Sequence, residues 1–416
     1  MAGKKGKGKK GKGKKGKRRR IDEFELRREL RRQAQRRSML EEEEMAKIEL
    51  PEAPEEIRLG GVEGGSSQSI FIIMDGKGTI LTEIKGPSTN HWALGIDETA
   101  ARINAMVEKG KQAIGMSELV PLDCLGLSLS GCEEEKTNRS LHETIQEKYP
   151  ATAKTFVVTS DVMGSLRTGF ANGGIVLIAG TGSQAFLVDV GNKMSKCGGW
   201  GHMIADEGSA YWIAHRACKY VFDDIDGLAR APRRISYVWP AIRHHFNVVT
   251  REEFLSHLYT NFNKTHFASF AKEIVQGCEK KDSLCLYILQ ENGRWLAKYI
   301  IALARKAHND LKLSPGGIKV ICVGSVWKSW YLMKDAFLDE IHQSMALDEL
   351  SLFHLKTTSA VGACYLAAEK VKWIFKKPYE DNIEVFHHYK RQNYVKPTSV
   401  EVPEDTVPCP GMEVRR

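Results

Sequence analysis

The sequence predicts an α/β fold made of two similar lobes, each opened by a hairpin and a glycine-rich turn. Apolar runs lead into segments of glycine and serine at 64–67, 180–183 and 324–325. A buried strand that ends in glycine forms a tight turn, because glycine reaches backbone angles that other residues avoid. Strands that alternate with helical segments are typical of α/β lobes. The repeated opening of the two halves therefore predicts a duplicated architecture with a ligand cleft between the lobes.

The first half shows a β-β-β-α-β-α pattern. Two apolar runs joined by Asp75-Gly76-Lys77-Gly78 indicate a hairpin. Later apolar runs at 125–129 and 155–159 indicate buried strands, separated by a helix around 138–148. The remaining elements expected in this half are strands at 57–62, 70–74 and 80–84 and a helix at 97–115.

The second half begins with a strand and hairpin at 175–190 and contains a further strand at 318–323. Helices are expected near 208–222, 251–261, 266–278, 283–308 and 329–345. The chain is thus divided into a disordered basic tail plus an exposed helix (1–57), an N-terminal α/β lobe (58–172), a C-terminal α/β lobe (173–375), a C-terminal helix (376–394) and a disordered tail (395–416).

The positive charge of the chain belongs to its first residues. The 416 residues carry a net charge of +9, but residues 1–20 hold twelve Lys or Arg and no acid, so the rest sums to −3. Such a block binds nucleic acid or an acidic partner through counterion release, or serves as a nuclear or nucleolar address. The alternative is a solvated extension without a function, and the sequence leaves these interpretations open.

The cysteines and the apolar runs indicate the cellular compartment that we expect for the protein. Nine cysteines occur, without a CxxC pair, and no apolar segment opens the chain. This pattern favours free thiols in a reducing compartment over disulfides or a zinc site. No apolar run of about 18 residues is present, so no membrane span is expected. We therefore expect a cytoplasmic protein.

The segment Gly180-Thr181-Gly182-Ser183 is the clearest chemical signal. It follows an apolar strand and offers bare backbone N–H groups and hydroxyls, which can wrap a phosphate. No GxxxxGK[ST] motif occurs, so a Walker-type ATPase is excluded. The segment therefore favours a nucleotide-handling enzyme over a structural module.

Several motifs together carry a resemblance to a known family that covers roughly residues 58–390. They are STNHW (88–92), LGLSLSG (125–131), TSD (159–161), LIAGTGS (177–183), CGGWGHMIADEGSAYWIAH (197–215) and CVGSVWKSW (322–330). In this order they resemble the N-acetyl-D-glucosamine kinases of the BadF/BadG/BcrA/BcrD branch of the actin, sugar-kinase and Hsp70 ATPase superfamily. The resemblance implies a duplicated ribonuclease-H-like fold with an interlobe cleft, ATP and Mg²⁺ as cofactors, phosphorylation of an amino sugar at its 6-hydroxyl, and a homodimer.

Asp161 is the predicted catalytic base. It follows a buried strand at the carboxyl end, which faces the ligand crevice in α/β sheets. A sugar hydroxyl is a poor nucleophile until a carboxylate orients it and accepts its proton. The family's base matches this position, whereas spacing alone allows equally an Asp that caps the helix from Val162.

The predicted sugar site combines polar side chains with glycines and one aromatic ring. Hydroxyl, amide and carboxylate groups beside an apolar ring suit a hexose. Taken alone, Asn90 is better explained as an Asx turn before a helix. Asp206 also fits a β-turn plus a helix N-cap, a role that is compatible with sugar binding. The resemblance implies that the sugar-binding residues are Asn90, Ser130, Asp161, Gly182, Ser183, Gly199, Trp200, Gly201 and Asp206, of which Gly182 and Ser183 are also assigned to the nucleotide phosphates.

The predicted nucleotide site uses hydroxyls and glycine turns aimed at phosphate. The resemblance assigns to it Ser67, Thr181, Gly324, Ser325 and Ser329, with Glu63 holding magnesium through water. The first turn departs from the family's pattern Glu-Gly-Gly-Gly-Thr-Arg/Lys. Ser66 adds a Cβ where glycine is expected and Gln68 removes a positive charge, so both changes weaken the expected contact with ATP.

Two rivals to a sugar kinase follow from these residues. A catalytically weakened paralogue would keep the fold and bind sugar, nucleotide or another partner, and the altered turn at 63–68 supports it. An ATPase that activates another enzyme, as related BadF-type proteins do, would need cysteines around an iron–sulfur cluster. The scattered cysteines argue against that second rival.

Overall fold

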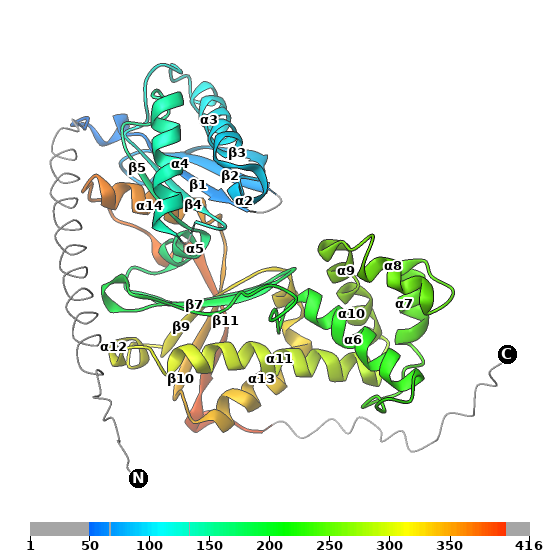
Figure 1. The fold of residues 1–416 in the computed structure, drawn as a ribbon. Coiled ribbons are helices and arrows are strands. Elements are labelled where there is room, and N and C mark those ends of the chain that lie inside the picture. Colours follow the sequence, from blue (N-terminus) through cyan, green and yellow to red (C-terminus); the bar gives the residue numbers. More distant parts are fainter. Residues whose placement is uncertain (1–49, 66–67, 133, 397–416) are drawn as a thin grey trace, which may run out of the picture.

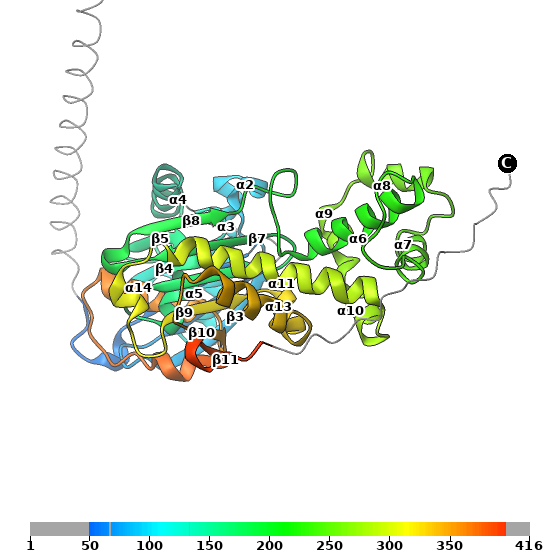
Figure 2. The ribbon, with the colours of Figure 1, turned by 90° about the horizontal axis from the view of Figure 1, so that it is seen from below.

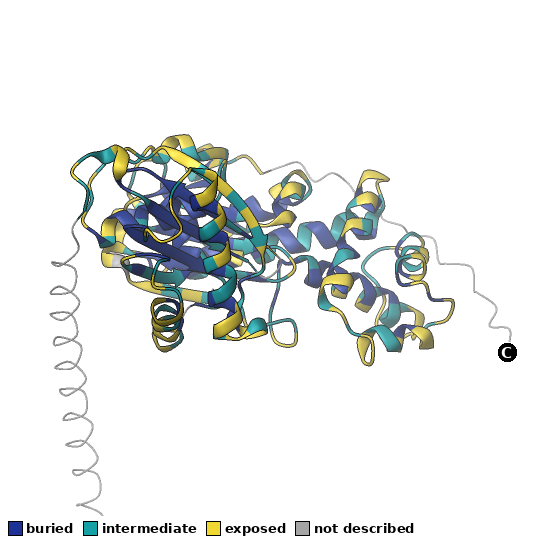
Figure 3. Ribbon diagram, turned by 90° about the horizontal axis from the view of Figure 1, so that it is seen from above, coloured by how far each residue is buried: buried dark blue, intermediate teal, exposed yellow. Residues whose placement is uncertain are grey.

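The computed structural model describes residues 50–65, 68–132 and 134–396, which form two lobes, each built around its own β-sheet (Figure 1). The tail and exposed helix predicted at the start of the chain fall on residues outside these ranges, apart from a short 3-10 helix, η1 (Pro54–Glu56). The predicted tail from 397 onward also lies outside the described residues. Buried residues follow the central strands and the inner faces of the helices (Figure 3).

The first sheet has the strand order β3-β2-β1-β4-β5. The pairs β1/β2 and β2/β3 are antiparallel, whereas β1, β4 and β5 run parallel. The predicted turn joins β2 to β3, because the Asp75 carboxylate accepts hydrogen bonds from the backbone N–H of Lys77 (2.9 Å) and Thr79 (2.8 Å). The strands are β1 (Leu59–Gly64), β2 (Gln68–Met74), β3 (Ile80–Pro87), β4 (Cys124–Leu129) and β5 (Phe156–Ser160).

The second sheet repeats this topology. Its order is β11-β10-β9-β6-β7-β8, and the five strands from β8 to β10 correspond to the five strands of the first sheet, with the same antiparallel and parallel pairs. The predicted α/β class with two duplicated lobes is therefore confirmed. The strands are β6 (Gly174–Ala179), β7 (Ser183–Val188), β8 (Met194–Gly198), β9 (Ile318–Val323), β10 (Glu349–Leu355) and β11 (Ile383–Lys390).

Helices cover both faces of the first sheet. α3 and α4 bury apolar side chains such as Ile103 and Leu141 against one face. α14 packs on the other face, where a Cβ at Gly61 or Gly126 would lie about 2 Å from a carbonyl oxygen of α14. These glycines therefore let the helix lie directly on the strands. The helices near this lobe are α2 (His91–Leu94), α3 (Ile96–Ala113), α4 (Glu135–Lys148), α5 (Asp161–Gly169) and α14 (Ala360–Lys370).

The second lobe carries a group of helices inserted between β8 and β9. α6 to α10 lie beside the sheet, and the long α11 runs from this group along the sheet next to α13 (Figures 1 and 2). The helices are α6 (Ala210–Ile225), α7 (Val238–Phe246), α8 (Leu255–Leu258), α9 (Lys264–Ser269), α10 (Ala271–Glu279), α11 (Ser283–Ala304), α12 (Asn309–Lys312) and α13 (Trp330–Ser344).

Two of the predicted assignments are wrong, one for the type of an element and one for the lobe to which a segment belongs. The helix predicted at 376–394 is instead the strand β11, which pairs antiparallel with β10 and is flanked by the short 3-10 turns η5 (Tyr379–Asn382) and η6 (Arg391–Asn393). Its β-branched and aromatic residues suit a strand that completes the edge of a sheet. The second correction concerns 360–371, predicted in the C-terminal lobe, because α14 buries Val361, Cys364 and Tyr365 in the core of the first lobe with Leu59 and Ile72.

Candidate active site

Asp161 stands where the parallel strands of the first sheet end. It is the first residue of α5, directly after β5, and its Oδ2 accepts a 2.6 Å hydrogen bond from the Ser130 hydroxyl. Ser130 follows β4, and its backbone N–H donates to the carbonyl of Gly64 at the end of β1 (2.8 Å). The carboxyl ends of three neighbouring strands thus meet around one carboxylate, as the sequence predicts for a crevice residue.

Asn90 lies at the same edge, and the loop before it is tied to the first glycine turn. The Ser88 hydroxyl donates to the carbonyl of Gly65 (3.0 Å). The Asn90 Oδ1 accepts from the backbone N–H of Trp92 (3.0 Å), so Asn90 does cap the short helix α2. Its amide NH₂ group carries two further donors for a ligand. The Trp92 indole in turn donates to the carbonyl of Gly131 (3.1 Å), which joins this loop to the turn after β4.

The turn between β6 and β7 gathers the predicted nucleotide residues of the second lobe. The backbone carbonyl of Gly180 accepts from Ala210 at the start of α6 (2.8 Å). Gly324 has a φ of 109°, and a Cβ there would lie 2.3 Å from the carbonyl oxygen of Ala179, so only glycine fits. The structure therefore brings the exposed residues Thr181 and Ser325 to neighbouring turns, while Ser329 lies one turn further on, where α13 begins.

Asp206 joins this second group of residues. Its side chain is buried and its φ is 74°, a left-handed conformation that is uncommon for a non-glycine residue. Its Oδ1 accepts from the backbone N–H of Ser183 (3.1 Å), and its Oδ2 forms a 2.7 Å ion pair with Lys264 Nζ. The helix cap that we considered for Asp206 belongs to Ser209, whose hydroxyl accepts from the backbone N–H of Trp212 (3.1 Å).

The second glycine cluster shapes an exposed loop in front of Asp206. Gly198, Gly199 and Gly201 all have φ between 72° and 80°, so side chains at these positions would strain the backbone. The ring of Trp200 is 69% exposed, and Met203 is 88% exposed. This loop thus exposes apolar side chains shortly before the buried Asp206 in the chain, and sugar sites combine apolar surface with such polar groups.

A largely buried tyrosine contacts Ser183 at this site. The Tyr299 hydroxyl lies 3.2 Å from the Ser183 hydroxyl, and burial raises the pKa of Tyr299 to about 12. The Ser183 hydroxyl donates to the carbonyl of Glu207 (2.6 Å). The Ser183 hydroxyl is therefore fixed by Glu207 and Tyr299, and its backbone N–H by the Asp206 carboxylate.

Glu63 has a structural partner that the sequence did not indicate. Its Oε2 accepts from the backbone N–H of Ser359 (2.9 Å) and from the hydroxyl of Thr358, so it fixes the segment that leads into α14. Among the described residues, no group of three or more His, Cys, Asp or Glu side chains is arranged to hold a metal. Mg²⁺ in phosphoryl-transfer sites is held mainly by substrate phosphates and water with one or two carboxylates, so a single Glu63 acting through water fits that donor set. Ser67 lies outside the described residues.

Lys264 is the residue that sequence reasoning missed. It belongs to α9 in the helical insertion, 58 positions from Asp206 along the chain. No motif surrounds it, so no local signal indicates the contact.

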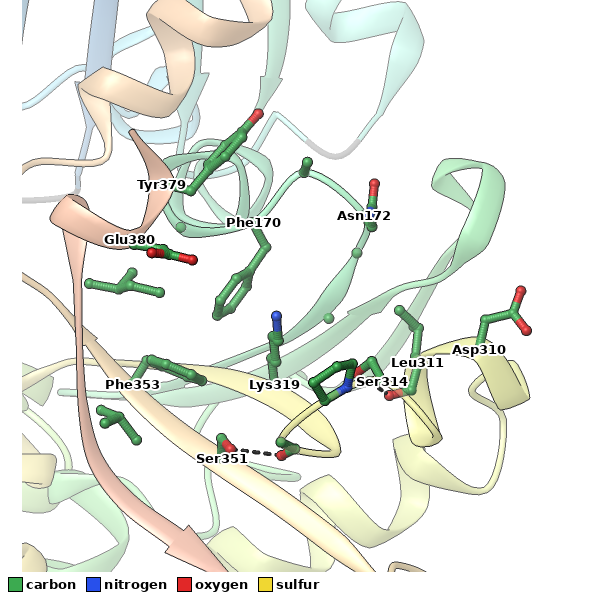
Figure 4. A pocket seen from close by; sticks show the side chains of 18 of the residues that line it. Phe170, Asn172, Asp310, Leu311, Ser314, Lys319, Ser351, Phe353, Tyr379 and Glu380 are labelled. Atoms are coloured by element: carbon green, nitrogen blue, oxygen red, sulfur yellow. Dashed lines mark hydrogen bonds between the residues drawn. The ribbon is translucent and has the colours of Figure 1, made fainter. Parts of the chain in front are cut away.

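A wide groove among the described residues lies away from these groups. It has a volume of about 1190 Å³ and runs along the amino ends of β6 and β9 and against β10 and β11 (Figure 4). Phe170, Lys319 and Tyr379 line it, and none of the predicted site residues does. The glycine turns lie at the opposite, carboxyl ends of β6 and β9, so the residues that the motifs indicate and this groove are at different places.

The duplicated lobes, with polar residues at the carboxyl ends of their parallel strands, define the two-lobed actin- and hexokinase-type fold of ATP-using enzymes. The chain belongs to the BadF/BadG/BcrA/BcrD ATPase family, whose sequence profile matches residues 61–367. The resemblance stated from the motifs is thereby confirmed, together with the predicted class, an ATP-using kinase.

Two curated relatives are similar in sequence. The N-acetylmuramic acid/N-acetylglucosamine kinase of Clostridium acetobutylicum is 25% identical over 316 residues, which cover 74% of this chain and 97% of the relative. The N-acetyl-D-glucosamine kinase of Dictyostelium discoideum is 25% identical over 169 residues, 39% of this chain and 53% of the relative. The match therefore spans nearly all of the first relative and about half of the second.

Solved structures support the fold. A crystal structure from Chromobacterium violaceum, named for an N-acetylglucosamine kinase, has a TM-score of 0.56 at 20% identity and covers 75% of this chain and 99% of its own. A similarly named structure from Porphyromonas gingivalis has a TM-score of 0.51 at 16% identity and covers 74% of this chain and 97% of its own. Within the described ranges, none of the helices combines the length and apolarity that a bilayer crossing requires.

Proposed function

We propose that this protein transfers the γ-phosphate of ATP to the 6-hydroxyl of N-acetyl-D-glucosamine, a step of amino-sugar salvage. The observation that carries the proposal is Asp161, placed at the end of β5 with its Oδ2 held by Ser130 (2.6 Å). The substrate follows the names of the two curated relatives. Dimerisation, a cytoplasmic location and a nucleic-acid or acidic partner for residues 1–20 stay predictions.

In this proposal Asp161 orients the sugar hydroxyl and accepts its proton as the bond to phosphorus forms. The Asn90 amide donates hydrogen bonds to the ring hydroxyls, the Asp206 carboxylate accepts hydrogen bonds from them, and Trp200 covers an apolar face of the sugar. Selectivity follows, because a sugar that lacks one hydroxyl leaves a buried polar group unpaired.

The turn at 180–182 and the residues Gly324 and Ser325 offer backbone N–H groups and hydroxyls to the nucleotide. Such fixed donors stabilise the charge of the transferring group at no cost of reorganisation. Magnesium, when bound with the nucleotide, would neutralise phosphate charge, and Glu63 would hold it through water by the oxygen that does not bind Ser359.

Sugar-dependent release of ADP by the purified chain tests the proposal. N-acetylglucosamine should stimulate ADP release, and the 6-deoxy analogue should bind without stimulating it. Phosphorus NMR should place the product phosphate on carbon 6. A chain that releases ADP equally with and without sugar would refute the proposal.

A second function, that of a weakened paralogue, is favoured by one observation. Gln68 stands exposed at the start of β2, where the family's pattern has a positive charge. Calorimetric binding of N-acetylglucosamine without turnover would support this function, and turnover would exclude it. The iron–sulfur activator has no such support, because seven of the eight described cysteines are buried and Cys197 is partly buried.

A further inference from the structure

Lys264 reaches from the helical insertion to the edge of the proposed site. It is the first residue of α9, whose start is fixed by Asn263 Oδ1 accepting from the backbone N–H of His266 (2.9 Å). Its Nζ lies 2.7 Å from Asp206 Oδ2. The Asp206 side chain is 4% exposed, whereas that of Lys264 is 32% exposed. The partly exposed Lys264 side chain therefore links a buried carboxylate to the protein surface.

The same ammonium group lies against the glycine turn. A Cβ built at Gly182 would be 3.2 Å from Lys264 Nζ and 2.9 Å from Asp206 Oδ1. The missing side chain of Gly182 is thus what lets the charged pair approach the backbone of the turn. Gly182 therefore does more than shape the turn, because a side chain at this position would crowd the Lys264 ammonium group.

An ammonium group has three N–H donors, and Asp206 takes one of them. The Lys264 side chain is partly exposed. Its two remaining N–H donors point to an anionic ligand, because lysine binds phosphate as a compact point charge. Helix α9 supplies this charge next to the turn at 180–182, which the proposed function assigns to the nucleotide.

We propose that Lys264 donates a hydrogen bond to a non-bridging oxygen of the phosphoryl group in transfer while it holds Asp206. This role rests on the proposed function. The bond from the γ-phosphorus to the bridging oxygen of ADP breaks, the bond to the sugar oxygen forms, and the sugar proton goes to Asp161. Lys264 keeps its proton throughout and stabilises the charge on the transferring group.

The test compares Lys264→Met and Lys264→Arg with wild type. Loss of one fixed donor to a transferring group lowers kcat by about 100-fold in comparable sites, so Lys264→Met should show a loss of this order. Lys264→Arg should recover part of kcat, because the charge remains. Lys264→Met should also weaken binding of a non-hydrolysable ATP analogue by roughly 10-fold, with ADP affinity nearly unchanged, since a charged hydrogen bond is lost only with the γ-phosphate.

Lys219→Met is the matched control. Lys219 also pairs with an aspartate in the helical insertion, Asp223 (2.5 Å), but on the exposed surface of α6. This variant should keep wild-type kcat and wild-type nucleotide preference.

The double variant Lys264→Met/Asp206→Asn separates a phosphate contact from simple support of Asp206. If Lys264 only neutralises Asp206, the double variant should have the same kcat as Asp206→Asn alone. In that case Lys264→Met should also raise the sugar KM and leave kcat within threefold of wild type. Either result would overturn the inference. A further loss of kcat in the double variant supports it. Wild type without sugar-dependent ADP release would instead refute the proposed function, and this role with it.

Discussion

The hydrogen bond from Ser130 to Asp161 gives the most quantitative prediction. At 2.6 Å it joins a hydroxyl to a carboxylate oxygen, so it belongs to the short, charge-assisted class. Such bonds contribute about 1.5–3 kcal/mol. If Ser130 fixes the direction in which Asp161 accepts the proton, Ser130→Ala should lower kcat by roughly 13- to 160-fold at about 1.36 kcal/mol per factor of ten.

The assay is coupled ADP release at saturating ATP and N-acetylglucosamine, with the thermal unfolding midpoint measured on the same preparations. Ser351→Ala is the matched control, because its hydroxyl makes a bond of similar length, 2.7 Å to the carbonyl of Gly316, beside the groove on the far edge of the second sheet. That control should lose stability but not kcat. A Ser130→Ala enzyme with kcat within threefold of wild type would refute the positioning argument.

Three further predictions concern the frame of the site. Gly126→Ala would place a Cβ 2.0 Å from the carbonyl oxygen of Ala363, so overpacking should destabilise the fold by about 1–3 kcal/mol in urea denaturation, and an unchanged midpoint would contradict the close approach of α14. Gly324→Ala, at a φ of 109°, should weaken ATP binding in calorimetry while sugar affinity stays the same. Burial, together with Lys334, lowers the pKa of His387 from 6.5 to about 4, so its contribution to stability is complete above pH 6.5 and is lost as the pH falls toward 4. The unfolding midpoint of His387→Gln should therefore fall less than that of wild type over this window.

Local patterns predicted the elements that carry their own signal. The run Ile318 to Val323 is apolar throughout and forms β9 with the predicted bounds. The hairpin predicted at 175–190 is formed by β6 and β7, which pair antiparallel on either side of the glycine turn. Asp161 was indicated by the buried strand before it together with the family resemblance, and Ser130 by the resemblance. Both lie at one edge because parallel strands bring their carboxyl ends together.

Contacts between distant segments explain what the sequence could not predict. β11 mixes charged residues and histidines with its β-branched and aromatic residues, so its local signal is mixed, and its pairing with β10 places it at the edge of the second sheet. The helix α14 joins the first lobe because its backbone fits the glycines of β1 and β4, which precede it by more than 200 positions in the chain. Likewise, Lys264 meets Asp206 only because the helical insertion folds back onto the turn after β6.

The most direct test of the account is Asp161→Asn, assayed for ADP release with and without N-acetylglucosamine. The account predicts that the variant keeps its thermal midpoint and still binds the sugar, but loses the sugar-dependent release, because the amide cannot accept the proton. Sugar-dependent release at close to the wild-type rate would contradict it.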